Sequence, residues 1–191
     1  MSRIVLASAS PRRQALLRQI GLTDFRIIVT ETDESWDPSL SPEEIVSTIC
    51  RRKAKAALEM AEEGDIIITA DTMVFLDDER LGKPHSEEDA YTMLSHLSGR
   101  ENTVWTGVTV ARGERMETEA EGTRVQFRPL TDSEIRSYIT TGEPMDKAGS
   151  YGIQGIGALL VEGIHGDYFN VMGLPLLRLS RMLRRFGVEL L

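Results

Sequence analysis

The sequence has few cysteine, histidine and aromatic residues. It contains one cysteine, three histidines and 6% Phe, Trp and Tyr among 191 residues. A single cysteine, Cys50, excludes both a disulfide framework and a zinc cluster built on thiolates, and it favours a reducing cytoplasm as the setting. His85, His96 and His165 lack the spacing of a metal site, so we expect them at the surface or at helix ends.

An excess of positive charge and long apolar runs are also absent. Lys and Arg total 22 against 30 Asp and Glu, which gives a formal net charge of -8. This acidic balance argues against a protein that wraps a long polyanion such as duplex DNA, so any phosphate binding must be local. No stretch reaches the ~20 apolar residues of a membrane span, and the N-terminus lacks the features of a signal peptide. We therefore expect neither nucleic acid nor a membrane as a partner.

The two best-known phosphate-binding motifs, the P-loop and the dinucleotide fingerprint, are missing as well. The chain opens instead with a short apolar run, residues 4–7, that predicts a buried strand, followed by Ser10 as helix N-cap and Pro11 at the first helical position. A helix start of this kind favours a phosphate, because its backbone N–H groups lack partners and its dipole is positive. Arg12 and Arg13 in that first turn indicate an anion between them and the loop. The alternative is that both point into water or pair with surface carboxylates.

The rest of the chain alternates between strand and helix patterns, which predicts an α/β fold. At this length we expect one domain, or one domain with a small appended lobe. Helices are predicted over 11–20 and 42–62, between Ser86 and Gly99, between Thr131 and Gly142, and from Pro175 onward. Strands are predicted over 25–30, 66–70 continuing through 73–76, 102–111, 120–127, 158–164 and 168–172.

Two charged residues lie in or directly after apolar segments. Lys53 falls on the apolar face of the helix predicted over 42–62, where its stem either brings an ammonium to a phosphate or simply reaches a wet edge. That face is formed by Val46, Ile49, Ala56, Ala57 and Met60. Asp71 follows the apolar strand 66–70, and a carboxylate at a strand exit suits a metal ligand or a base that activates water. A simple turn cap is the other interpretation.

Three further candidates lie in predicted loops. Glu34 stands in an acidic segment after the strand at 25–30, either as a metal ligand or in a solvated loop. Lys83 lies between a glycine and a proline, which holds its ammonium over a phosphate or marks an ordinary loop. Gln154 lies in a glycine-rich run over 145–157, and its amide can both donate and accept, as reading a base edge requires. A structural turn is the alternative for this run.

Seven short motifs occur along the chain in a specific order. They are Leu6-Ala7-Ser8-Ala9-Ser10-Pro11-Arg12-Arg13, Lys53-Ala54-Lys55-Ala56, Ala70-Asp71-Thr72, Gly82-Lys83-Pro84, Leu97-Ser98-Gly99, Asp146-Lys147-Ala148-Gly149-Ser150-Tyr151-Gly152-Ile153-Gln154-Gly155 and Gly173-Leu174-Pro175. With them the sequence resembles the Maf family of nucleoside triphosphate pyrophosphatases over essentially its whole length.

This resemblance implies a fold and an activity. The fold is mixed α/β, with a curved central sheet flanked by helices and two lobes around a cleft, similar to the inosine triphosphate pyrophosphatases. It forms a single domain over residues 1–191. The activity is hydrolysis of a nucleoside triphosphate between its α and β phosphates, with Mg²⁺ or Mn²⁺, to the monophosphate and pyrophosphate. The subgroup that this chain resembles prefers dTTP and UTP, with a house-cleaning role against non-standard pyrimidine nucleotides. The alternatives are another phosphate enzyme, or a nucleotide-binding regulator of septum formation with incidental hydrolysis.

The resemblance also implies roles for individual residues. Asp71 is the catalytic base and, with Glu34, a metal ligand. The triphosphate is expected to bind Ser8, Arg12, Arg13, Lys53 and Lys83, to which we add Ser10. The specificity positions are Arg12, Thr72 and Gln154. The expected partner is the nucleotide substrate, and a homodimer is left open.

Overall fold

A computed structural model describes residues 3–191, so the first two residues of the predicted domain lie outside it. Seven strands form one sheet in the order β2-β1-β3-β5-β6-β7, with β4 beside β3. The strand β1 pairs in parallel with β2 and β3, whereas β4 and β7 pair antiparallel with β3 and β6. The sheet is therefore mixed, and the predicted α/β class is confirmed.

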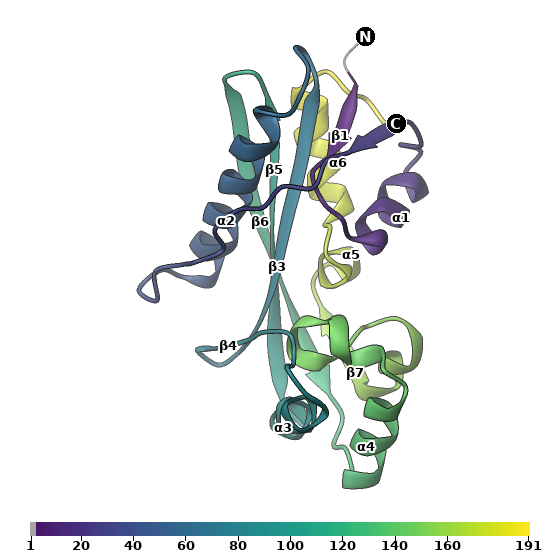
Figure 1. Cartoon of the computed structure of the whole chain (residues 1–191). Coiled ribbons are helices and arrows are strands. Elements are labelled where there is room, and N and C mark those ends of the chain that lie inside the picture. The colour runs from purple at the N-terminus through teal and green to yellow at the C-terminus, as the bar shows by residue number, and fades with distance from the viewer. Residues whose placement is uncertain (1–2) are drawn as a thin grey trace. The chain divides into compact units, whose positions relative to one another are not determined.

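The elements follow one another in the chain as Figure 1 labels them. The strands are β1 (Ile4–Leu6), β2 (Phe25–Ile27), β3 (Ile66–Leu76), β4 (Glu79–Leu81), β5 (Glu101–Arg112), β6 (Arg115–Phe127) and β7 (Val161–His165). The α-helices are α1 (Pro11–Gln19), α2 (Pro42–Leu58), α3 (Glu87–Leu97), α4 (Asp132–Thr140), α5 (Tyr168–Met172) and α6 (Leu176–Arg185). Three 3₁₀ turns, η1 (Glu143–Asp146), η2 (Ala148–Ser150) and η3 (Gly155–Leu160), follow α4.

The chain divides into two compact units. Unit 1 contains the described residues up to Asp71 together with Thr106–Glu121 and Gly173–Leu191, and unit 2 contains Thr72–Trp105 and Gly122–Met172. The single domain over 1–191 stays a prediction. Between residues 3 and 191, no helix combines the length and the apolar character that a membrane crossing requires.

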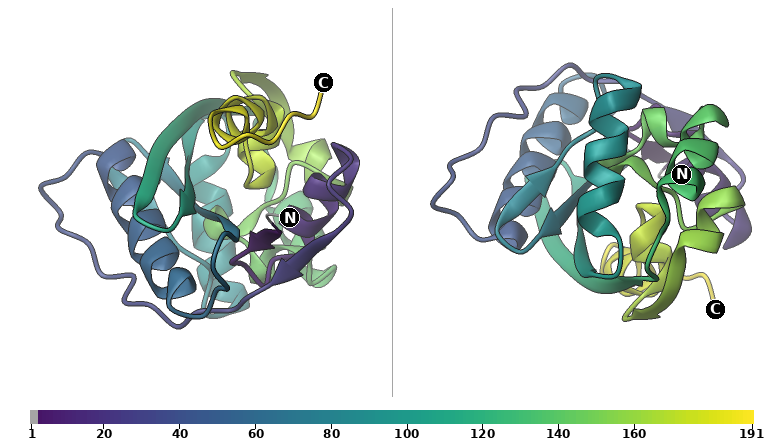
Figure 2. Two further views of the ribbon diagram at one scale, coloured as in Figure 1. Left: turned by 90° about the horizontal axis from the view of Figure 1, so that it is seen from above. Right: turned by 90° about the horizontal axis from the view of Figure 1, so that it is seen from below.

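In unit 1, the helix α2 packs against one face of β3. Side chains alternate along a strand, so Ile67, Thr69 and Asp71 share a face. Helical spacing places Cys50 and Lys53 on one side of α2. The two sets meet, because the Thr69 hydroxyl donates to the Cys50 carbonyl at 2.9 Å. Val5, Ala54, Ala57 and Ile67 belong to one apolar cluster there. Figures 1 and 2 show α2 on one side of β3, with α1 and α6 on the other.

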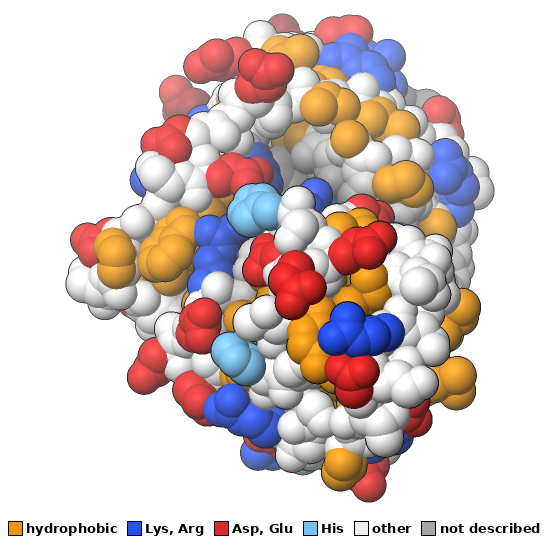
Figure 3. All heavy atoms as spheres, turned by 60° about the horizontal axis from the view of Figure 1, so that its bottom comes forward, with side chains coloured by type: hydrophobic (Ala, Val, Ile, Leu, Met, Phe, Trp, Pro, Cys, Tyr) orange, Lys and Arg blue, Asp and Glu red, His pale blue; other side chains and the backbone are white. Residues whose placement is uncertain are grey.

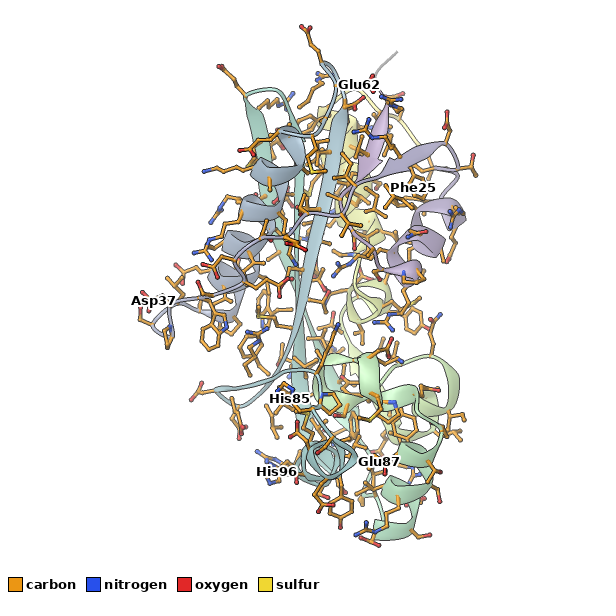
Figure 4. All side chains as sticks on the ribbon, viewed as in Figure 1. Phe25, Asp37, Glu62, His85, Glu87 and His96 are labelled. Carbon is orange, nitrogen blue, oxygen red and sulfur yellow. The ribbon has the colours of Figure 1, made fainter. Side chains whose placement is uncertain are left out.

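In unit 2, α3 and α4 begin at the predicted caps. The Ser86 hydroxyl accepts the N–H of Asp89, and Thr131 forms a reciprocal capping box with Glu134. The Asp89 carboxylate binds the N–H of His85 instead of closing a box with Ser86. All three histidines are exposed, as predicted. Figure 4 labels His85 and His96 in the region of α3, and Figure 3 shows histidine at a surface with many acidic side chains.

Three element predictions are wrong. Residues 168–172 form the helix α5 rather than a strand, because the Asp167 carboxylate caps it by accepting the N–H groups of Phe169 at 2.7 Å and Asn170 at 3.3 Å. The strand predicted over 158–164 begins only at Val161, after a 3₁₀ turn. The helix predicted to residue 62 ends at Leu58, which leaves Met60 55% exposed rather than on the apolar face.

Candidate active site

The turn between β1 and α1 is built as a helix N-terminus with serine caps. The Ser8 hydroxyl accepts the Ser10 N–H at 3.2 Å, and the Ser10 hydroxyl accepts the Arg13 N–H at 3.5 Å. Pro11 occupies the first helical position, where its missing N–H costs nothing. The first turn of α1 contains no acidic residue. The positive end of the helix dipole therefore lies beside two arginines, which is the electrostatics of an anion site.

Arg13 connects this turn to the segment before α6. Its Nε donates to the Gly173 carbonyl at 2.8 Å, and its Nη1 donates to the Ser8 hydroxyl at 3.2 Å. Burial lowers the pKa of Arg13, while the negative charge of Asp71 opposes that shift. Arg13 is half-buried and hydrogen-bonded inside unit 1, which does not fit the alternative in which it points into water.

Lys53 and Asp71 form the central pair of unit 1. The Lys53 Nζ lies 2.6 Å from Asp71 Oδ1 and 2.8 Å from Glu34 Oε1. The side chains of Lys53 and Asp71 are 15% and 11% exposed. Burial acts to lower the pKa of Lys53, but the two carboxylates outweigh it and the pKa is raised, so the ammonium keeps its proton at neutral pH. The Lys53 stem thus leads to two carboxylates rather than only to solvent.

Asp71 occupies a different place in its strand from the one predicted. It lies within the unbroken strand β3, not at an exit. The neighbouring strand β1 ends at Leu6, however, and the Ala7 N–H after it donates to the Ile68 carbonyl at 2.8 Å. Asp71 therefore follows the point where β1 leaves the sheet. A carboxylate there has one less strand beside it and can face a ligand.

Glu34 belongs to the long loop between β2 and α2, whose tip is near Asp37 in Figure 4. Its side chain is 56% exposed. The Arg52 guanidinium donates to the backbone carbonyls of Asp33 and Ser35 on either side of Glu34. Arg52 thus fixes the loop segment that brings Glu34 to Lys53. Periodicity offered no signal for this contact.

Cys50 lies beneath the pair as a packing residue. It is fully buried, and its thiol donates to the Gly107 carbonyl at 3.0 Å. Burial, with the negative charge of Asp71 adding to it, raises the pKa of Cys50 to about 12. The thiol is therefore protonated at neutral pH and is not a nucleophile.

The carboxylates of this site, Asp71 and Glu34, are too few to hold a divalent cation alone, but they suit one that is also bound by a phosphate ligand. Within residues 3–191, no group of three or more His, Cys, Asp and Glu side chains is arranged to hold a metal ion. Asp71 and Glu34 nevertheless converge on one point, the Lys53 Nζ. Mg²⁺ is commonly bound by one or two carboxylates plus substrate phosphates, so these two residues suit a cation that arrives with a phosphate ligand.

The other predicted site residues belong to unit 2. Thr72 follows Asp71 in β3 and is half-buried. Lys83, after β4, and Gln154, before η3, have exposed side chains. Their roles in binding and specificity stay predictions. Sequence reasoning missed Glu143, whose carboxylate accepts backbone N–H groups of the glycine-rich run.

The fold and the site define a mixed α/β protein in which a serine-capped helix N-terminus with two arginines accompanies a largely buried lysine–carboxylate pair. The family described as Maf-like protein matches residues 3–186, and the chain belongs to the Maf family. It is 48% identical to the dTTP/UTP pyrophosphatase of Pelotomaculum thermopropionicum over 100% of both chains. It is 52% identical to the dTTP/UTP pyrophosphatase of Carboxydothermus hydrogenoformans over 97% of this chain and 99% of that one. The solved Staphylococcus aureus Ham1 protein is similar at a TM-score of 0.47, with 16% identity over 66% of this chain and 72% of that chain.

Proposed function

We propose that the protein hydrolyses dTTP and UTP between the α and β phosphates, yielding the nucleoside monophosphate and pyrophosphate. The observation that supports this most is the convergence of Asp71 and Glu34 on the ammonium of Lys53. A protein that only binds nucleotides has no need of a carboxylate at the position of Asp71. The names of the full-length relatives support the same activity and do not favour the alternative of a regulator with incidental hydrolysis.

Each residue of unit 1 then has a role that its contacts support. Asp71 orients the attacking water and accepts its proton, because a carboxylate held by one strong hydrogen bond keeps further lone pairs for a second donor. Lys53 balances the negative charge of Asp71 and Glu34, which would otherwise repel a triphosphate. Ser8, Ser10, Arg12 and Arg13 bind phosphate oxygens at the start of α1, where the helix dipole adds to the arginine charges.

A divalent cation belongs to the proposal as well. Asp71 and Glu34 would hold it, and Mg²⁺ or Mn²⁺ there would lower the pKa of bound water and neutralise charge that develops on the leaving pyrophosphate. In this structure the Lys53 ammonium forms ion pairs with the same two carboxylates. We therefore expect one of these ion pairs to break when a nucleotide and its cation bind.

The setting of the reaction is proposed from the composition. We propose a cytoplasmic enzyme, supported by Cys50 as a free, buried thiol in a chain with no other cysteine. A homodimer remains part of the proposal. Nucleic acid is not expected as a partner, because the net charge is -8.

A substrate panel tests the choice of nucleotide. We expect kcat/KM for dTTP and UTP to exceed the values for CTP, ATP and GTP by about tenfold or more, since an amide that hydrogen-bonds one base edge leaves unpaired groups with another. The measurement is initial rates with Mg²⁺ at fixed ionic strength. Faster turnover of purine triphosphates would contradict the pyrimidine preference.

A further inference from the structure

The loop over residues 152–157, which we call the Gln154 loop, is held at its C-terminal end by one carboxylate. Glu143 Oε1 accepts the N–H of Gly157 at 2.9 Å, and Glu143 Oε2 accepts the N–H of Ile156 at 3.0 Å. Hydrogen bonds to an ionised carboxylate are roughly twice as strong as neutral ones. Both bonds join residues 13 or 14 positions apart, so they fix the loop to η1 rather than stabilise a local turn.

The N-terminal end of the loop is joined to the same carboxylate through one hydroxyl. Tyr138 on α4 donates its hydroxyl to Glu143 Oε1 at 2.9 Å and accepts the N–H of Gly152 at 3.2 Å. Tyr138 is only 2% exposed, so its ring is fixed by the core of unit 2. Gln154 lies between these anchored ends, with an exposed side chain.

Two glycines of the loop, Gly155 and Gly157, lie too close to this carboxylate and its surroundings to accept a side chain. A Cβ on Gly155, whose φ is +66°, would lie 2.6 Å from Glu143 Oε2. A Cβ on Gly157 would lie 2.2 Å from the Gly152 carbonyl oxygen and 2.6 Å from the Tyr138 hydroxyl. The sequence suggested that these glycines let the backbone approach a ligand or turn sharply. The groups that Gly155 and Gly157 approach are the Glu143 carboxylate, the Tyr138 hydroxyl and the Gly152 carbonyl.

Glu143 is held in its ionised form. Burial acts to raise the pKa of Glu143, but the N–H groups of Gly157 and Ile156, the Tyr138 hydroxyl and the charge of Lys147 outweigh it, so the pKa is lowered. The Lys147 Nζ also donates to the Glu143 backbone carbonyl at 2.6 Å, which fixes the main chain of this residue. The anchor is therefore charged at neutral pH.

We propose that Glu143 is a positioning residue that, together with Tyr138, holds the Gln154 loop so that the Gln154 amide selects the base of the nucleotide. The inference rests on the proposed function and deepens it. An amide discriminates between base edges only if its donor and acceptor are fixed in orientation, and the backbone that sets this orientation is bound to Glu143 at one end and to Tyr138 at the other.

The test is Glu143→Gln, which keeps the size of the side chain but leaves one of the two backbone N–H groups facing an amide NH₂. We expect the ratio of kcat/KM for dTTP over CTP to fall about tenfold, mostly through KM for dTTP, while kcat for dTTP changes less than about threefold. Tyr138→Phe removes the acceptor for Gly152 and should shift the ratio in the same direction. The double variant Glu143→Gln/Gln154→Ala should have the same dTTP/CTP ratio of kcat/KM as Gln154→Ala alone, because both substitutions act through the Gln154 amide.

Glu134→Gln is the matched control. It weakens the capping box and the Arg128 contact of α4 in the same unit, so it should lower the melting temperature without moving the dTTP/CTP ratio. The inference is overturned if Tyr138→Phe and Glu143→Gln leave the ratio within about twofold of the wild type, or if Glu134→Gln shifts it equally. If Glu143→Gln does not fold, the dTTP/CTP ratio of the Tyr138→Phe variant alone tests the inference. A wild-type protein with no activity on dTTP and UTP would instead contradict the proposed function, and the inference with it.

Discussion

Replacing Asp71 by asparagine should lower kcat for dTTP by about 10²–10⁴, the contribution typical of a positioned general base. Asparagine has nearly the same shape but cannot take a proton from water. It also removes the stronger partner of Lys53, whose Nζ lies 2.6 Å from Asp71 Oδ1. Nucleotide binding should persist, because the phosphate-binding groups at the start of α1 are unchanged and a negative charge near the triphosphate is lost. Steady-state rates and equilibrium binding of dTTP measure the two effects separately.

Asp65→Asn is the control for Asp71. Asp65 is also buried, at 5% exposure, and it precedes β3 in the same unit, where its carboxylate accepts the N–H of Glu62. This variant should lower stability and leave kcat near the wild-type value. An Asp71→Asn protein with kcat within threefold of the wild type, by the same assay, would refute the role of Asp71 as the base.

Replacing Lys53 by methionine should lower kcat/KM by about 10²–10³. Methionine keeps the apolar stem but leaves Asp71 and Glu34 without the ammonium that lies 2.6 and 2.8 Å from them. Two uncompensated carboxylates would repel the substrate phosphates and each other. The free energy of unfolding should also fall, by about 1–3 kcal/mol, because removing one partner of a largely buried ion pair leaves the other charge uncompensated. Kinetics and urea unfolding measure the two losses.

Lys55→Met provides the comparison, because Lys55 is an exposed lysine two residues further along the same helix. It makes the same chemical change to α2 outside the carboxylate pair, so both kcat/KM and stability should stay near wild type. If Lys55→Met and Lys53→Met lowered kcat/KM equally, net charge rather than the contact with Asp71 and Glu34 would explain the loss.

The periodic parts of the chain were predictable because burial and geometry repeat along them. The stripe of α2 placed Lys53 on a buried face, and the apolar run of β3 pointed to Asp71, which was expected at the exit of the strand rather than inside it. For each residue the sequence left both a functional and a structural interpretation open. The contact between them depends on the packing of α2 against β3, and a sequence pattern does not specify that tertiary packing. Alternation along β3 and the helical spacing of α2 together explain the contact once that packing is known.

The irregular parts were not predictable in the same way. Residues 168–172 are a short apolar run that fits a strand or a helix, and the cap from Asp167 decides for the helix. Arg52 and Glu143 act on backbone groups 13–19 positions away in the chain, and side-chain periodicity says nothing about such contacts. The Gly142-Glu143-Pro144 sequence before a glycine-rich run was the only signal near Glu143.

The central claim is that water cleaves the bond between the α and β phosphates, with Asp71 as its base. The most direct measurement is the product of dTTP hydrolysis by the wild-type protein with Mg²⁺, resolved by phosphorus NMR or anion-exchange chromatography. The account predicts dTMP and pyrophosphate in equal amounts, formed at a rate that Asp71→Asn lowers by about 10²–10⁴. Release of orthophosphate and dTDP would contradict it.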